Sequence, residues 1–196
     1  MKIRSALLLL CAFATVAPAQ VGEISLSFGR SLFKNNKLGT ELGSTANYQI
    51  RDGFHMAARM TLNTKRFVGH EFGYAYNRSH LGLGGARVDD DISVPVHQGF
   101  YNFLVYGTPE GSRIRPFAAG GGHFSSFYPP GASVSYGNGI TKFGVNYGAG
   151  VKVKVTPIFN FRVDIRDYLT PKPFDLVNRS GPLHQVEVSA GVGFMF

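Results

Sequence analysis

The sequence predicts an all-β fold, an eight-stranded antiparallel up-and-down transmembrane β-barrel. Three observations lead to this prediction. Apolar and polar residues alternate over segments of about ten residues, and short connections between these segments alternate with long ones. The chain also ends on an aromatic residue, Phe196. Together these features are typical of barrels with an apolar outer face and a polar lumen.

The alternation is clearest near the C-terminus. In the last ten residues, EVSAGVGFMF, Val192 and Phe194 fall on one face of a strand while Glu187 and Ser189 fall on the other, because successive side chains point to opposite faces. The two preceding segments repeat this pattern, with charges of both signs on the polar face. Alternation alone also fits a soluble barrel with an apolar interior, so the connections must decide.

Eight segments can be assigned along the chain: residues 22–33, 53–63, 68–78, 97–107, 113–124, 142–154, 158–169 and 184–196. The second, fourth and sixth connections are short (NTKR, GTPEGS and TP), and the others are long. An eight-stranded barrel with both termini in the periplasm has short turns there and long loops outside. Two details stay open: extra strand around Tyr48 to Ile50, and the register of the fourth and fifth segments, where Phe100 and Tyr101 put bulky groups on both faces.

The N-terminus predicts export. Lys2 and Arg4 precede an apolar run that ends in Ala17-Pro18-Ala19, the order of regions in a secretory signal peptide. We therefore expect residues 1–19 to be a signal peptide and residues 20–196 to form one barrel domain. Cleavage would remove the only cysteine, and the formal net charge of +8 would fall by the two basic residues to +6.

A moderately basic exported protein is expected to contact anionic lipid or lipopolysaccharide rather than nucleic acid. The chain has no dense run of lysine and arginine and no nucleic-acid recognition motif. It also has no amphipathic helical period of useful length.

The ending Val186-x-Val188-x-Ala190-x-Val192-x-Phe194-x-Phe196, with the signal peptide and the eight alternating segments, resembles the small outer-membrane barrel family. That family is typified by the membrane domain of OmpA, by OmpX and by their single-domain relatives. The resemblance implies a location in the outer membrane of a Gram-negative-type envelope. It also implies that Phe194 and Phe196 belong to the signal read by the outer-membrane assembly machinery, and that the barrel is a monomer. The peptidoglycan tethering that OmpA-type proteins often perform through a further domain is not expected here.

The polar faces predict an ionic network inside the barrel. Burial of an unpaired charge is costly, whereas paired charges are tolerated. We expect the network to be centred on Asp164 and Glu187, to fix the strand register and to obstruct the lumen. Its expected members are Arg59, Glu71, Lys152, Lys154, Arg162, Asp164, Arg166 and Glu187.

The outer face should carry two aromatic girdles at the membrane interfaces. The candidates are Tyr74, Tyr76, Tyr101, Tyr147, Phe28 and Phe161.

One short motif points to chemistry. His123 and Ser125 lie two residues apart on one strand face, and a histidine within reach of a serine can activate it as a nucleophile. The pair resembles that of outer-membrane lipid A deacylases, although no acidic partner lies at a fixed spacing. The candidates for an acidic partner in space are Asp89 to Asp91 and Glu71. A two-residue motif is weak evidence.

No cofactor is expected. The acidic run VDDDIS lacks ordered ligand spacing, and the six histidines show no pair at metal-ligand spacing. The main hypothesis is therefore a non-enzymatic outer-membrane barrel with long extracellular loops and a structural or surface-interaction role. The alternatives are a lipid A-type deacylase using His123 and Ser125, and a narrow pore, which suffers because side chains nearly fill an eight-stranded barrel.

Overall fold

The computed structural model describes residues 21–40, 47–83, 92–128, 139–174 and 181–196. These residues form nine β-strands: β1 (Val21–Lys34), β2 (Lys37–Thr40), β3 (Asn47–Lys65), β4 (Val68–Leu83), β5 (Ile92–Tyr106), β6 (Ile114–Phe127), β7 (Ile140–Lys154), β8 (Phe159–Thr170) and β9 (Leu183–Met195). Within those ranges, no helix is long and apolar enough to cross a membrane.

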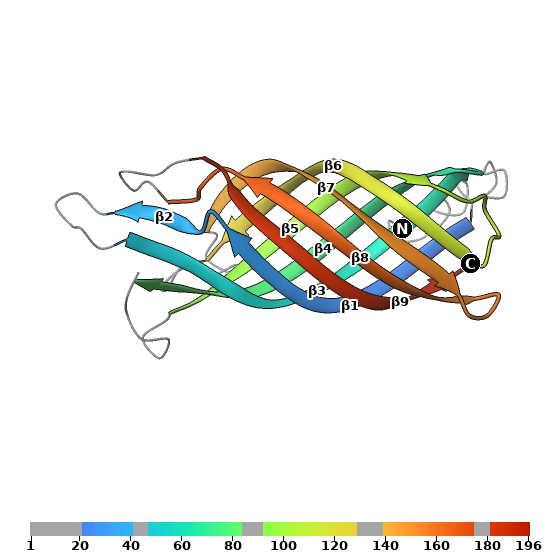
Figure 1. Cartoon of the computed structure of the whole chain (residues 1–196), viewed down its shortest axis with the longest axis horizontal. Helices are drawn as coiled ribbons and strands as arrows, with labels where there is room; N and C mark the ends of the chain where they lie inside the picture. Colours follow the sequence, from blue (N-terminus) through green and yellow to red (C-terminus); the bar gives the residue numbers. More distant parts are fainter. Residues whose placement is uncertain (1–20, 41–46, 84–91, 129–138, 175–180) are drawn as a thin grey trace, which may run out of the picture.

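Eight of the strands close into a barrel. Each pairs antiparallel with its neighbour in the chain, and β1 pairs with both β9 and β3, which closes the sheet. The short strand β2 pairs with β3 alone among these barrel strands. The strands wrap obliquely around the long axis (Figure 1). The start of β1 and the last residue, Phe196, meet at one end of the barrel, which we call the end with the termini. The predicted eight-stranded antiparallel up-and-down barrel is confirmed.

The three short connections lie at the end that carries the termini. They are residues 66–67 between β3 and β4, 107–113 between β5 and β6, and 155–158 between β7 and β8. At the same end the backbone of Phe196 exchanges two hydrogen bonds of 2.9 Å with Gly22, which fixes the last residue of the chain to the first strand.

Strands β3, β4 and β5 extend beyond the predicted segments, and they project with β2 at the end opposite the termini (Figure 1). Tyr48 to Ile50, where extra strand was expected, belongs to β3, and β2 is a further strand in the same connection. In β5, whose register the sequence left open, Phe100 and Leu104 point inward, while Tyr101 and Phe103 are exposed. The pairing of β5 with β6 runs without a shift.

The polar faces point into the barrel and the apolar faces point out. On β8, for example, Arg162 is 1% exposed whereas its neighbours Phe161 and Val163 are 57% and 50% exposed. A soluble barrel requires the reverse arrangement, so that alternative is wrong.

Inward-facing glycines let the strands coil tightly. A Cβ atom on Gly148 would lie 2.2 Å from the carbonyl oxygen of Ile165, and one on Gly121 would lie 1.9 Å from that of Tyr101. Because real side chains never approach a backbone atom this closely, any larger residue would push neighbouring strands apart.

Candidate functional site in the barrel lumen

The lumen is filled in layers. At the end opposite the termini lies an apolar cluster that we call the apolar plug, formed by Phe33, Leu38, Ile50, Val94, Val96, Phe127 and Leu183. Each of these side chains is at most 6% exposed. Below the plug come a layer of hydrogen-bonded polar side chains, then an ionic cluster, and then a second apolar layer of Leu104, Tyr106, Phe117 and Ala119.

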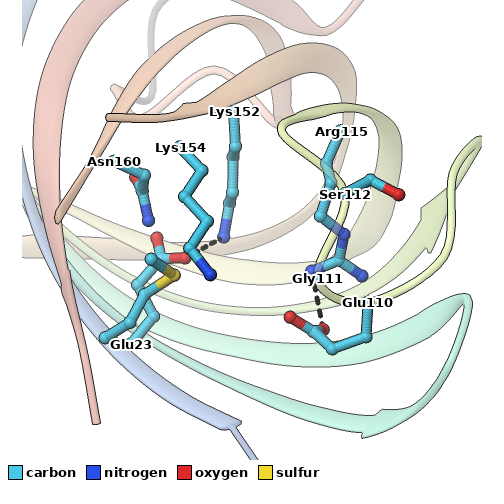
Figure 2. Close-up of a pocket in the computed structure, with 9 residues that line it drawn as sticks. Glu23, Glu110, Gly111, Ser112, Arg115, Lys152, Lys154 and Asn160 are labelled. Carbon is cyan, nitrogen blue, oxygen red and sulfur yellow. Dashed lines mark hydrogen bonds and ion pairs between the residues drawn. The ribbon is translucent and has the colours of Figure 1, made fainter. Parts of the chain in front are cut away.

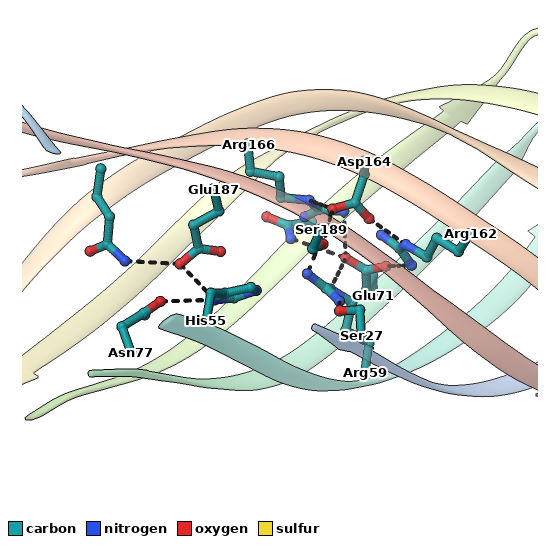
Figure 3. A network of polar contacts seen from close by, with 12 residues as sticks. Ser27, His55, Arg59, Glu71, Asn77, Arg162, Asp164, Arg166, Glu187 and Ser189 are labelled. Atoms are coloured by element: carbon teal, nitrogen blue, oxygen red, sulfur yellow. Dashed lines mark hydrogen bonds and ion pairs between the residues drawn. The ribbon is translucent and has the colours of Figure 1, made fainter. Parts of the chain in front are cut away.

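The ionic cluster consists of five buried side chains: Arg59 of β3, Glu71 of β4, and Arg162, Asp164 and Arg166 of β8. Figure 3 shows them converging at the middle of the barrel. Glu71 contacts all three arginines of the cluster. Its Oε2 lies 2.5 Å from Arg162 Nη1, its Oε1 lies 2.8 Å from Arg166 Nη2, and Arg59 Nε is 4.0 Å away.

Asp164 is the second anion of the cluster. Its Oδ2 accepts a 2.5 Å hydrogen bond from Arg162 Nε, and its Oδ1 lies 3.7 Å from Arg59 Nη2. Ser189 of β9 donates a 3.1 Å hydrogen bond to the same Oδ1. These contacts join β3 and β4 to β8 and β9 across the lumen, so the cluster ties together strands that are far apart in the sheet.

Most buried charges of the lumen lie opposite a charge of the other sign. Four of the buried cations, Arg59, Lys152, Arg162 and Arg166, share the interior with the anions Glu23, Glu71, Asp164 and Glu187. The two other buried cations have partners as well, because Arg115 pairs with Glu110 and Lys172 donates to the backbone oxygen of Lys37. Such pairing is what burial requires, because an uncompensated charge in a low-dielectric interior is strongly unfavourable.

Two details of the predicted network are corrected. Its centre is Glu71 with Asp164, rather than Asp164 with Glu187. Although Glu187 is the register partner of Arg166, the long guanidinium side chain of Arg166 reaches across the barrel to Glu71 instead. The two predicted lysines lie outside the cluster. Lys152 pairs with Glu23 instead, and Lys154, two residues further along the strand, lies about 6.6 Å nearer the turn.

Glu187 belongs to the polar layer above the cluster. Its Oε1 accepts a 2.9 Å hydrogen bond from Gln185 and lies 3.2 Å from His55 Nδ1. The layer continues through Asn77, which donates to Gln98 at 2.6 Å. It thereby links β3, β4, β5 and β9 through side chains alone.

A small pocket lies near the end with the termini, and Figure 2 shows the residues that line it. Lys152 Nζ donates to Glu23 Oε2 at 2.8 Å, and Arg115 Nη1 lies 2.7 Å from Glu110 Oε2. Between these pairs is a cavity of about 20 Å³, which Lys154 also lines. This volume accommodates roughly one water molecule.

Both His123 and Ser125 are buried inside the lumen. His123 Nε2 lies 2.9 Å from Thr170 Oγ1, and its ring packs edge-on against Tyr168. Ser125 Oγ accepts a 3.0 Å hydrogen bond from Gln98. The two side chains therefore engage other partners. Of the expected acidic partners, Glu71 is held by arginines, and Asp89 to Asp91 lie outside the described residues.

In the part of the chain that the structure describes, no three histidine, cysteine, aspartate or glutamate side chains come together as a metal site would require.

Comparison with known proteins decides the family. The sequence matches the model of the outer membrane protein beta-barrel domain over residues 5–196. The chain belongs to this family. No curated protein matches the sequence significantly.

Solved outer-membrane barrels share the fold. OprG from Pseudomonas aeruginosa is 11% identical with a TM-score of 0.65, over 90% of this chain and 97% of that one. Neisserial surface protein A is 17% identical with a TM-score of 0.57, over 89% and 97%. Ail of Yersinia pestis is 14% identical with a TM-score of 0.52, over 90% and 99%. At these identities the likeness shows the fold alone.

As a member of the outer membrane protein beta-barrel family, the protein resides in the outer membrane. The exposed apolar side chains on its wall therefore face lipid, among them Val188, Val192 and Phe194. Because barrels of this kind keep short turns in the periplasm and long loops outside, we infer that the end with the short connections is periplasmic and the opposite end extracellular.

Each of the six girdle candidates points outward. Tyr74, Tyr101, Tyr147, Phe28 and Phe161 are exposed, and Tyr76 is half-buried on the same outer face. At the C-terminus, the rings of Phe194 and Phe196 stack with centroids 6.5 Å apart on the wall. Both rings are exposed on the outer face.

Sequence reasoning did not single out Glu23, His55, Asn77 and Gln98 as lumen residues. The sequence does indicate their orientation, because the two-residue period of each strand assigns them to its inward face. What the period does not supply is the partner across the barrel.

Proposed function

We propose that this protein is a closed, non-enzymatic outer-membrane scaffold that presents its extracellular end for structural or surface interactions. The observation that carries the proposal is the filled lumen. The apolar plug, the polar layer, the ionic cluster and the second apolar layer follow one another along the barrel axis.

A narrow pore is the first alternative, and the ionic cluster argues against it. Three guanidinium groups meet two carboxylates at the middle of the lumen, with Glu71 fully buried. A passing ion would have to displace these contacts, each of which is stronger in a dry interior than in water. The apolar plug adds a second obstruction nearer the extracellular end.

A lipid A deacylase is the second alternative. Its nucleophile would have to reach an acyl chain in the membrane, yet Ser125 faces the lumen and is fully buried. The hydrogen bond that His123 makes goes to Thr170 rather than to Ser125, so the activating contact that nucleophilic catalysis needs is missing from this arrangement.

The extracellular end supports an interaction role. Strands β3, β4 and β5 project there, and β2 adds a further hairpin arm (Figure 1). A rigid framework with projecting segments is a common platform for binding. Closure of β1 on both neighbours leaves no barrel edge to pair with another copy, which supports a monomer.

Two measurements test the proposal. Liposomes that contain the purified barrel should not swell when a monosaccharide is supplied outside, whereas liposomes with a general porin should. In the second, lipid A from cells expressing the protein should have the same acyl-chain masses as lipid A from cells expressing Ser125→Ala. Swelling would favour the pore, and an acyl loss that Ser125→Ala abolishes would favour the enzyme.

A further inference from the structure

Two arginines stand on the lipid-facing wall of the barrel without a partner among the residues that the structure describes. Arg30 of β1 and Arg78 of β4 are both exposed on the outer face. Among the described residues, neither takes part in a hydrogen bond or an ion pair. This contrasts with the buried arginines of the lumen, all of which are paired.

The strand register places the two arginines side by side around one aromatic ring. Phe54 of β3 is the register partner of Arg30 on one side and of Arg78 on the other. Adjacent strands lie about 4.8 Å apart, so the Cα atoms of the two arginines are about 10 Å apart. Phe54 is half-exposed between them, and its ring stacks on Phe28 at 6.3 Å.

The neighbouring residues also define the position of the two arginines along the barrel axis. On the periplasmic side of Arg30, the outward residues of β1 are Phe28, Leu26 and Ile24, all of them apolar and exposed. On β4, Tyr76 and Tyr74 lie immediately below Arg78. The arginines thus mark the upper border of the apolar belt, where a charged residue costs only about 0 to 1 kcal/mol, against about 2 to 4 kcal/mol at the midplane.

One carboxylate lies near the pair. Asp52, on the extracellular side of Phe54, accepts a 2.8 Å hydrogen bond from the backbone N–H of Phe33. That bond anchors Asp52 to β1 at the irregularity in β3 between Arg51 and Phe54. The site therefore keeps a surplus of positive charge on the lipid side of the wall.

We propose that Arg30 and Arg78 form a binding site for the phosphates of a lipid A-type lipid in the outer leaflet, with Phe54 and Phe28 contacting its acyl chains. Guanidinium groups bind phosphate oxygens in pairs of parallel hydrogen bonds. A phosphorylated lipid brings such groups to the border of the apolar belt, and its acyl chains lie along the aromatic wall below. The proposal rests on the outer-membrane location and not on the closed lumen.

The test is binding of purified, detergent-solubilised protein to bis-phosphorylated lipid A, with fully dephosphorylated lipid A as the matched probe. Arg30→Gln and Arg78→Gln should each weaken binding about tenfold, which matches a charge-assisted hydrogen bond of about 1.4 kcal/mol. Arg113→Gln, which removes an exposed arginine at the periplasmic turn, should leave binding unchanged. The native protein should bind the dephosphorylated probe about as weakly as the double variant binds lipid A.

A double Arg→Lys variant keeps both charges and should bind with intermediate affinity, so it provides a readout even if the double glutamine variant fails to fold. Folding of every variant is checked by its gel shift on boiling. Native affinity in the double variant, an equal loss in Arg113→Gln, or displacement of lipid A by equimolar inorganic phosphate would each overturn the proposal.

Discussion

Replacement of Glu71 by glutamine should destabilise the barrel more than the same replacement of Glu187 or Glu110. Glu71 is fully buried and contacts Arg162 at 2.5 Å and Arg166 at 2.8 Å. Three arginines and two carboxylates leave the ionic cluster one positive charge in excess, and Glu71→Gln raises that excess to two.

The expected cost follows from the contacts. Removal of one partner from a buried pair costs about 3 to 5 kcal/mol. Glutamine keeps the shape and one acceptor oxygen, so we expect a loss of about 3 kcal/mol in the free energy of unfolding. Glu187→Gln should cost about 1 to 2 kcal/mol, because its close partners are Gln185 and His55 rather than an arginine. Glu110→Gln, at the half-exposed periplasmic mouth, should cost about 0 to 1 kcal/mol.

The assay is urea unfolding in lipid vesicles, followed by tyrosine fluorescence because the chain has nine tyrosines and no tryptophan. The double variant Glu71→Gln with Arg162→Gln should recover at least about 1 kcal/mol relative to the sum of the single changes. If Glu71→Gln unfolds like Glu110→Gln, or if Glu187→Gln is the more damaging change, the account of the cluster is wrong.

Three further predictions concern the wall and the strand packing. Val192→Arg places a charge in the apolar belt and should cost about 2 to 4 kcal/mol near the midplane, whereas Ser189→Thr on the lumen side should cost less than about 1 kcal/mol; equal costs in vesicle unfolding would contradict the assignment of faces. Phe196→Ser should lower the amount of heat-modifiable barrel in outer-membrane fractions without affecting secretion across the inner membrane, and unchanged insertion would remove Phe196 from the assembly signal. Gly148→Ala should cost about 1 to 3 kcal/mol because its Cβ would meet the backbone of β8, while Gly122→Ala, whose Cβ meets nothing closer than 3.9 Å, should be nearly neutral in the same unfolding assay.

The fold could be predicted from the sequence because its signals are local. A two-residue period assigns each side chain to a face, and turn length assigns each connection to an end. The projecting parts of β4 and β5 were missed for the same reason, whereas Tyr48 to Ile50 of β3 was noted as a place for extra strand. The strand partner of Val94, Ser79, and the other residues of the apolar plug are distant in the chain, so no local pattern marks Val94 as strand.

The lumen could be predicted by face but not by partner. The period places Arg166, Glu71 and Glu187 inside, yet which carboxylate Arg166 meets depends on strand tilt and side-chain reach across the barrel. The strand register places the backbone of Arg166 beside that of Glu187. The guanidinium group of Arg166, however, lies several bonds away from its own backbone and contacts Glu71 instead. Partner choice inside a barrel is therefore a property of the closed structure.

The two unpartnered arginines could likewise be predicted by face but not by neighbour. Arg30 and Arg78 interrupt otherwise apolar outer faces, and this is visible in the sequence once the faces are assigned. Their proximity is not visible, because it requires the register of β1, β3 and β4 together.

The central claim is that the lumen is closed, and the most direct test is single-channel recording from the purified native protein in a planar bilayer. The account predicts no large, stable current steps at moderate voltage, while a general porin in the same bilayer produces them. Reproducible, stable single-channel currents from the native barrel would contradict the claim and make the narrow pore the leading function.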